Sequence, residues 1–244
     1  MDPFKYTFLG HRGLNHCNPM SEAKLHEVLE QMELAPGSLA VDIGCGKAEL
    51  LVQMANRFGV IGQGVDRSPQ MIAHAREHAR ERVTRGSVTL HLMDAAAFEP
   101  EPRSLDVAAC LGATEVFGGF RSAVQRLAGW VRPGGFVLAG EGFWQRDPAP
   151  EFLAAMEAKP DDYLSHAGNI ASGTGLIPLY AAAASADEWD RYEWRHCANI
   201  ERYAALNPED PDVPSLVARR RAWRDLYLKW GRDTLGFGLY LFRC

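Results

Sequence analysis

Leu39-Ala-Val-Asp-Ile-Gly-Cys-Gly46 is the most informative motif for the fold of this 244-residue chain. Its first five residues form a short, mostly apolar run that predicts a buried strand, and its glycines predict a tight turn. Helical periodicity follows from Ala48 to Phe58. Residues 39–58 therefore predict strand, glycine turn and helix, in the place where a nucleoside ligand can approach the backbone because glycine carries no Cβ.

The same alternation of strand and helix continues to Glu141. Strands are predicted over 60–65, 87–92, 105–111 and 136–141, and helices over 69–83 and 120–131. Strands separated by helices of this length pair in parallel through right-handed crossovers. The pattern predicts a doubly wound, Rossmann-like α/β sheet of seven mostly parallel strands, with helices on both faces.

Both ends of the chain depart from this alternation. Apolar residues recur at helical spacing between Met20 and Leu34, so residues 1–35 are expected to form an arm and helix that cover the site. Residues 36–244 form the main domain, with a core over 39–141 and a partly helical insertion, a candidate substrate lid, over about 144–175. Residues 176–244 are expected to hold a strand at 176–184, helices at 187–205 and 215–231, and a last strand at 237–242.

Two acidic residues follow the second and third predicted strands. Asp66 ends Gly64-Val-Asp66, 20 residues beyond Gly46, where a carboxylate can accept hydrogen bonds from both hydroxyls of a ribose. Asp94 follows Leu92-Met93 and could accept from an adenine amino group, with Ala95 supplying a backbone donor. Taken singly, each feature has another explanation, because a Gly-x-Gly turn joins many strands to helices and Asp often caps a helix.

Taken together, these motifs resemble the class I S-adenosylmethionine-dependent methyltransferases, in the branch of type 11 methyltransferase domains. The resemblance covers roughly residues 39–141. The matching motifs are Val41-Asp-Ile-Gly-Cys-Gly-Lys-Ala48, Gly64-Val-Asp-Arg-Ser-Pro-Gln-Met71, Met93-Asp-Ala95, Leu105-Asp-Val-Ala-Ala-Cys110 and Leu127-Ala-Gly-Trp-Val-Arg-Pro-Gly-Gly135. One departure is Ala48, which stands where the family often has a third glycine.

The resemblance implies a binding site for S-adenosylmethionine, converted to S-adenosylhomocysteine, and a last strand that is antiparallel and inserted between two others. Asp42, Gly44, Cys45 and Gly46 would lie at the methionine end of the cofactor. Asp66 and the neighbouring Arg67 would lie at the ribose, and Asp94 and Ala95 at the adenine. Met71 would flank the base, and Cys110 would lie near the sulfonium.

The acceptor of the methyl group is harder to predict, because an in-line displacement needs positioning and needs a base only if the acceptor loses a proton. The segment 11–19 is rich in polar groups and supplies His11, His16 and Asn18. Turns after the fourth and fifth strands supply further polar and aromatic groups. These are Glu115, Glu141 and Trp144. His16 and Glu141 are the candidate catalytic bases, and the others are candidate substrate contacts.

The composition and the motifs of the chain argue against several classes of binding partner. A net charge of −5 gives no general attraction to a polyanion, and the Asn/Asp-Pro-Pro-aromatic motif of amino-methylating nucleic-acid enzymes is replaced by Cys110-Leu-Gly-Ala-Thr114. Neither a nucleic acid nor a membrane is expected as a partner, the expected location is the cytoplasm, and the expected state is a monomer or homodimer. No metal is expected, and the five cysteines contain no CxxC pair.

The prediction is therefore a methyltransferase that acts on a small-molecule acceptor. An NAD(P)-dependent oxidoreductase of Rossmann fold is one alternative, although Glu49 stands where its glycine pattern requires Gly or Ala. A protein that binds S-adenosylmethionine without turnover is another.

Overall fold

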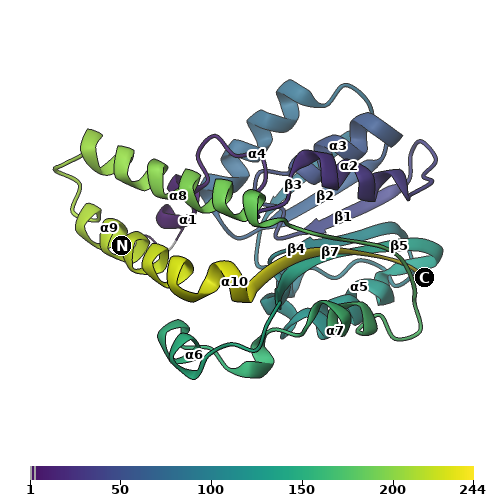
Figure 1. Ribbon diagram of the computed structural model, residues 1–244. Helices are drawn as coiled ribbons and strands as arrows, with labels where there is room; N and C mark the ends of the chain where they lie inside the picture. The colour runs from purple at the N-terminus through teal and green to yellow at the C-terminus, as the bar shows by residue number, and fades with distance from the viewer. Residues whose placement is uncertain (1, 3) are drawn as a thin grey trace.

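The computed structural model describes residue 2 and residues 4–244, so Met1 and Pro3 of the predicted arm lie outside the described residues. One seven-stranded sheet forms the centre, in the order β3-β2-β1-β4-β5-β7-β6 (Figure 1). The strands are β1 Leu39–Ile43, β2 Ile61–Asp66, β3 Ser87–Leu92, β4 Leu105–Leu111, β5 Val131–Trp144, β6 Ile177–Ala183 and β7 Leu235–Arg243.

Strands β1 to β5 pair in parallel, and the last strand β7 is antiparallel to both of its neighbours, β5 and β6. This confirms the predicted mostly parallel sheet with an antiparallel last strand inserted between two others. In the register of β1 and β2, Ile43 lies opposite Val65. The glycine turn after β1 and the carboxylate of Asp66 at the end of β2 therefore emerge side by side at one edge of the sheet.

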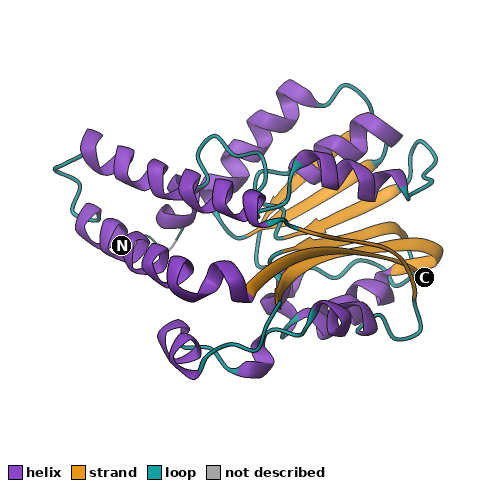
Figure 2. Ribbon diagram, in the orientation of Figure 1, coloured by secondary structure: helices purple, strands orange, loops and turns teal. Residues whose placement is uncertain are grey.

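Helices cover both faces of the sheet (Figure 2). On one face lie α2, α3 and α4, and on the other lie α5 and α7, while α8 and α9 project beyond the edge where the parallel strands end. The helices are α1 Lys5–Gly10, α2 Glu22–Glu30, α3 Glu49–Phe58, α4 Pro69–Arg82, α5 Phe120–Trp130, α6 Pro150–Met156, α7 His166–Ala171, α8 Ala186–Leu206, α9 Val213–Leu226 and α10 Arg232–Thr234.

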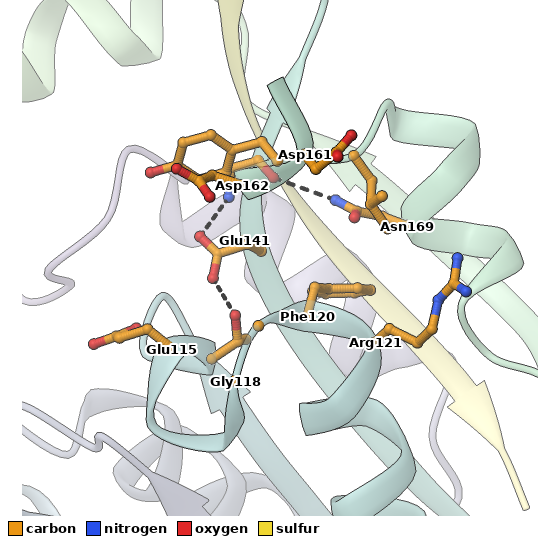
Figure 3. A pocket seen from close by; sticks show the side chains of 13 residues that line it. Glu115, Gly118, Phe120, Arg121, Glu141, Asp161, Asp162 and Asn169 are labelled. Carbon is orange, nitrogen blue, oxygen red and sulfur yellow. Dashed lines mark hydrogen bonds between the residues drawn. The ribbon is translucent and has the colours of Figure 1, made fainter. Parts of the chain in front are cut away.

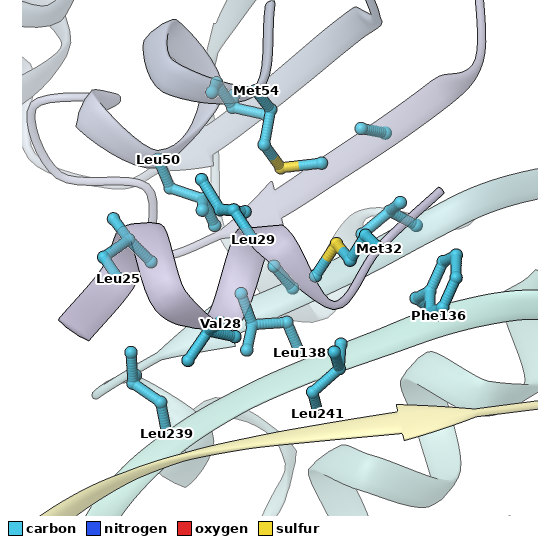
Figure 4. Packing of buried hydrophobic residues seen from close by; sticks show 14 of the residues in the cluster. Leu25, Val28, Leu29, Met32, Leu50, Met54, Phe136, Leu138, Leu239 and Leu241 are labelled. Atoms are coloured by element: carbon cyan, nitrogen blue, oxygen red, sulfur yellow. The ribbon is translucent and has the colours of Figure 1, made fainter. Parts of the chain in front are cut away.

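Alternation along the central strands explains this layering, since successive side chains of a strand point to opposite faces. In β5, Leu138 packs under α2 and α3, whereas Val137 and Ala139 pack against α5. On α2 the predicted apolar face is buried against α3 and strands β5 and β7 (Figure 4). Its members are Leu25, Val28 and Leu29, and Met32, just after the helix, is buried with them. Each such fully buried side chain contributes about 1.5–3 kcal/mol of hydrophobic stabilisation.

Three elements differ most from the sequence expectation. Helix α1, with six residues, was not predicted, and the helix predicted over 215–231 is an α-helix only from Val213 to Leu226. The fifth strand runs from Val131 to Trp144 instead of 136–141. Both extensions of this strand have tertiary causes, because Val131 pairs with Leu105 of β4 and Trp144 pairs with Leu235 of β7. Among the described residues, no helix combines the length and the apolar character that a membrane crossing requires.

Candidate functional site

The glycine turn after β1 adopts backbone conformations that side chains disfavour. Gly44 has φ of 69° and Gly46 has φ of 52°. A Cβ on Gly44 would lie 2.4 Å from the Cβ of Ala113, on the turn after β4. The Gly44 and Cys45 backbone N–H groups both donate to the Val65 carbonyl, at 2.8 and 3.0 Å. The turn is thus held against β2, and its position depends on glycine.

Asp66 is tied to the same turn. One carboxylate oxygen accepts from the backbone N–H of Gly46 at 2.9 Å, and the other accepts from the backbone N–H of Ser68 at 2.8 Å. A carboxylate oxygen can accept more than one hydrogen bond, so the Asp66 side chain is oriented by the backbone and keeps acceptor capacity toward a ligand.

A cavity of about 360 Å³, which we name the glycine-loop cavity, opens beside these residues. It lies at the carboxyl ends of the parallel strands, where open α/β sheets bind ligands. Seven of the residues that the sequence proposes for the cofactor line this cavity. They are Gly44, Gly46, Asp66, Arg67, Met71, Asp94 and Ala95. Asp94 also accepts from the Ala96 backbone N–H at 2.9 Å, so it caps a short helix as well.

The other three residues proposed for the cofactor lie beneath the cavity wall. Asp42, Cys45 and Cys110 are buried, and burial raises the pKa of both thiols well above their usual range. Within the described part of the chain, one oxygen of Asp42 has no hydrogen-bond partner. Burial together with the nearby Asp66 raises the pKa of Asp42 to about 8. A cation at this place would relieve an uncompensated buried carboxylate. The ammonium group of a bound amino acid fits that requirement.

The N-terminal arm forms one wall of the glycine-loop cavity, through Phe4, Thr7, His11 and Cys17. Lys47, in the glycine turn, donates to the carbonyls of His11 and Leu14, at 2.6 Å each, and so fixes the arm over the turn. Lys47 belongs to the matching motif Val41–Ala48, but the sequence alone predicted no role for it.

His11 lies at the centre of this wall in a neutral state. Burial lowers its pKa to about 4. Its Nδ1 lies 2.6 Å from the Thr7 carbonyl and its Nε2 lies 2.8 Å from the Tyr192 hydroxyl. Because a carbonyl can only accept, Nδ1 carries the proton and Nε2 accepts from Tyr192. His11 thus presents a neutral, fixed ring to the cavity.

A second cavity, of about 580 Å³, lies beyond the turn after β4 (Figure 3). We name it the carboxylate cavity, because it is lined by Glu115, Glu141, Asp161 and Asp162, with Arg121 as the one cation among its lining residues in the described part of the chain. Glu115 lines the glycine-loop cavity too, so the two cavities share a wall. Asp161 and Asp162, in the insertion, were not predicted.

Glu141 is the most constrained carboxylate of this cavity. It accepts hydrogen bonds from the Thr114 hydroxyl and, at 2.8 Å, from the Gly142 backbone N–H. Burial raises its pKa, and the charge of Glu115 acts in the same direction. A carboxylate with a raised pKa accepts a proton more readily near neutral pH.

The structure does not bring three of the proposed acceptor-side residues to either cavity. Trp144 lies behind the carboxylate cavity, where its ring meets that of Tyr163 and its Nε1–H donates to the Pro160 carbonyl at 2.8 Å. Asn18 lines a separate hollow under α8. His16 lies with Glu22 and Glu49 in a group whose ligand atoms are all within 4.8 Å of one another.

Such a group could hold a metal ion, but Glu49 already has strong partners. It forms an ion pair with Arg82, and His78 Nε2 lies 2.6 Å from it. The guanidinium compensates the charge that a metal would otherwise neutralise. We therefore assign no metal to this group.

Comparison with known proteins agrees with this geometry. A family model described as a methyltransferase domain matches residues 40–135. The chain is 30% identical over 227 residues to YjhP of Escherichia coli K12, covering 91% of each chain. Two crystal structures of S-adenosylmethionine-dependent methyltransferases in complex with S-adenosylhomocysteine superpose with TM-scores of 0.89 at 29% identity. One is from Geobacter sulfurreducens, covering 98% of this chain and 97% of that one, and the other from Thiobacillus denitrificans, covering 100% of both.

The chain belongs to the class I S-adenosylmethionine-dependent methyltransferases. YjhP is a relative that matches over 91% of both chains. The family assignment confirms the resemblance drawn from the motifs and makes S-adenosylmethionine the cofactor. It also removes the reading of the chain as an NAD(P)-dependent oxidoreductase.

Proposed function

We propose that this methyltransferase transfers its methyl group to a small molecule bound in the carboxylate cavity. The observation that carries the proposal is the shared wall, since Glu115 lines both the carboxylate cavity and the glycine-loop cavity. A volume of about 580 Å³ lies within the range of sites for small ligands.

The residues of the glycine-loop cavity would hold the cofactor as the sequence motifs suggest. Asp66 would accept from the ribose hydroxyls, and Asp94 from the adenine amino group, with Met71 against the base. Asp42 would face the ammonium of the methionine end. When bound there, the cofactor supplies an electrophilic methyl group on a sulfonium.

The chain's own contribution is to position the acceptor and to exclude water, which are the main requirements of an in-line displacement. The N-terminal arm closes one side of the cofactor site, held there by Lys47. Of the two candidate bases, Glu141 lines the acceptor cavity and His16 does not. We retain Glu141 as the proton acceptor.

The test combines binding and turnover. Purified protein is first scanned for thermal stabilisation by S-adenosylhomocysteine and by NAD, and stabilisation by S-adenosylhomocysteine is expected. The protein is then incubated with a small-molecule extract and with cofactor carrying a CD₃ methyl group, and products are sought by mass spectrometry. The proposal predicts enzyme-dependent labelled products of low molecular mass. Binding of S-adenosylhomocysteine with no labelled product would instead support a protein that binds the cofactor without turnover.

A further inference from the structure

We infer that the acceptor is a small organic amine, bound as its ammonium cation in the carboxylate cavity. This inference rests on the proposed function and adds the chemical class of the substrate. It is drawn from the charge of the cavity, from an unsatisfied acceptor in its wall and from its aromatic surfaces.

The charge of the cavity is strongly one-sided. Four carboxyl groups face it against the single guanidinium of Arg121, which extends along the side away from Glu115 and Glu141 (Figure 3). The negative charge of the cavity also acts on Tyr163. Burial raises the pKa of its phenol, and Glu141, Asp162 and Glu115 raise it further. An anionic acceptor would be repelled here, and a cation would be attracted.

Asn169 supplies an observation that does not depend on the carboxylates. This residue is fully buried, lines the cavity and donates from Nδ2 to the Gly142 carbonyl at 3.3 Å and to the Tyr240 hydroxyl at 3.1 Å. Its Oδ1 has no hydrogen-bond partner among the residues that the structure describes. A buried acceptor without a donor is costly, so the cavity is built for a ligand that brings N–H or O–H donors.

An ammonium group meets both requirements, because it carries a positive charge and several N–H donors and has no acceptor. Two aromatic residues, Phe120 and Tyr163, also line the cavity. Aromatic faces attract cations and also accommodate the carbon skeleton of an amine. An alcohol would satisfy Asn169 but leave the negative charge of the carboxylates uncompensated.

The chemistry balances with groups already placed. The bound ammonium gives one proton to the Glu141 carboxylate, which exposes the nitrogen lone pair. That lone pair forms a C–N bond with the methyl carbon while the C–S bond breaks and its electron pair goes to sulfur. The products are a methylated ammonium and neutral S-adenosylhomocysteine, and Glu141 then releases its proton to solvent. Glu115, in the shared wall, would keep the ammonium beside the methyl group.

The test measures binding to protein saturated with S-adenosylhomocysteine, using benzylamine, benzyl alcohol and benzoate as matched probes. Calorimetry is expected to show benzylamine binding at least about tenfold more tightly than either neutral or anionic probe. Glu115→Gln and Asp161→Asn each remove one charge and keep the shape, so each should reduce that preference severalfold. The control Arg121→Gln removes the cation and should leave benzylamine binding equal or tighter.

The inference would be overturned if the three probes bound equally or if none of them bound. It would also be overturned if the preference for benzylamine survived in the double variant Glu115→Gln with Asp161→Asn. The assay with CD₃-labelled cofactor separates this failure from that of the proposed function. Labelled products of low molecular mass alongside any of these binding results would overturn the amine inference alone, whereas the absence of labelled products would count against the proposed function. A transfer assay adds a second readout. Glu141→Gln should lower the rate of amine methylation by at least about tenfold, whereas raising the pH should partly restore it because more amine is then already deprotonated.

Discussion

The carboxylate of Asp66 accepts a hydrogen bond from the backbone N–H of Gly46 at 2.9 Å, across a sequence separation of 20 residues. This contact joins the end of β2 to the glycine turn after β1. The residue proposed for the ribose therefore also holds the loop proposed for the methionine end.

The first prediction follows from that contact. Asp66→Ala should weaken binding of S-adenosylhomocysteine by about 1–3 kcal/mol, because hydrogen bonds to a carboxylate are lost at the ribose and at Gly46. Isothermal titration calorimetry measures the change. As a control, Asp161→Asn, in the carboxylate cavity, should leave this affinity within about twofold. Unchanged affinity in Asp66→Ala would show that the ribose lies elsewhere.

The second prediction concerns pH and Asp42. The pKa of Asp42 is about 8 in the folded protein, against 3.8 for an ordinary aspartate. Folding therefore favours the protonated form. The ligand-free protein should lose stability as pH rises through the window from about 4 to about 8, because the unfolded chain releases this proton first. Asp42→Asn should flatten that decline, which thermal melts from pH 5 to 8 would show. If the melting temperatures of the two proteins fell equally with pH, the raised pKa of Asp42 would be contradicted.

Asp42→Asn has an opposite effect on the ligand. Removal of the carboxylate should weaken binding of S-adenosylhomocysteine, because the amide cannot compensate the ammonium charge. A variant that is more stable at pH 8 and binds less tightly would separate a binding role from a purely structural one.

The third prediction concerns Gly44. An alanine there would adopt a disfavoured φ and place its Cβ 2.4 Å from that of Ala113. Gly44→Ala should cost about 1–3 kcal/mol of stability and reduce affinity for S-adenosylhomocysteine. The double variant Gly44→Ala with Ala113→Gly removes the contact but not the backbone strain, and should recover part of the loss in urea unfolding. A single variant as stable as the wild type would count against this account of the turn.

The fourth prediction compares two ion pairs of the projecting helices. Arg220 and Glu193 join α9 to α8, at 2.5 Å, with side chains only 4% and 5% exposed. Arg220→Met leaves the buried Glu193 carboxylate without a cation, although Trp223 Nε1–H still donates to it at 2.9 Å. The variant should destabilise the protein by about 3–5 kcal/mol. The neighbouring pair of Arg221 and Glu201 is 55% and 41% exposed, so Arg221→Met should cost less than about 1 kcal/mol. Chemical denaturation distinguishes the two, and similar losses would be inconsistent with this reading.

The sheet and its glycine turn could be predicted because their signals are local. Residues 39–46 combine an apolar strand with a glycine pair, and residues 69–82 begin after Ser68, whose hydroxyl caps the helix by accepting from Met71. Helix α1 could not be predicted in the same way. It is six residues long, has no side-chain cap and is held by distant partners, such as Lys5 with Asp210.

The acceptor side shows the same limit. Glu115 lies in the turn after β4, and Glu141 ends the strand predicted over 136–141 although β5 continues to Trp144. Their edge of the sheet could therefore be predicted. Asn169 lies in the irregular insertion, and its contact with Tyr240 spans 71 residues, which no local pattern reveals. Trp144 was proposed to contact the substrate, but its ring packs on Tyr163 and thus supports the cavity wall.

A crystal structure of the protein grown with S-adenosylhomocysteine would show whether Gly44, Gly46, Asp66 and Asp94 surround the cofactor. Ligand density is expected in the glycine-loop cavity, with both ribose hydroxyls within hydrogen-bond distance of Asp66 and the sulfur facing the turn that carries Glu115. Density for the ligand in any other cavity, or a ribose out of reach of Asp66, would contradict it.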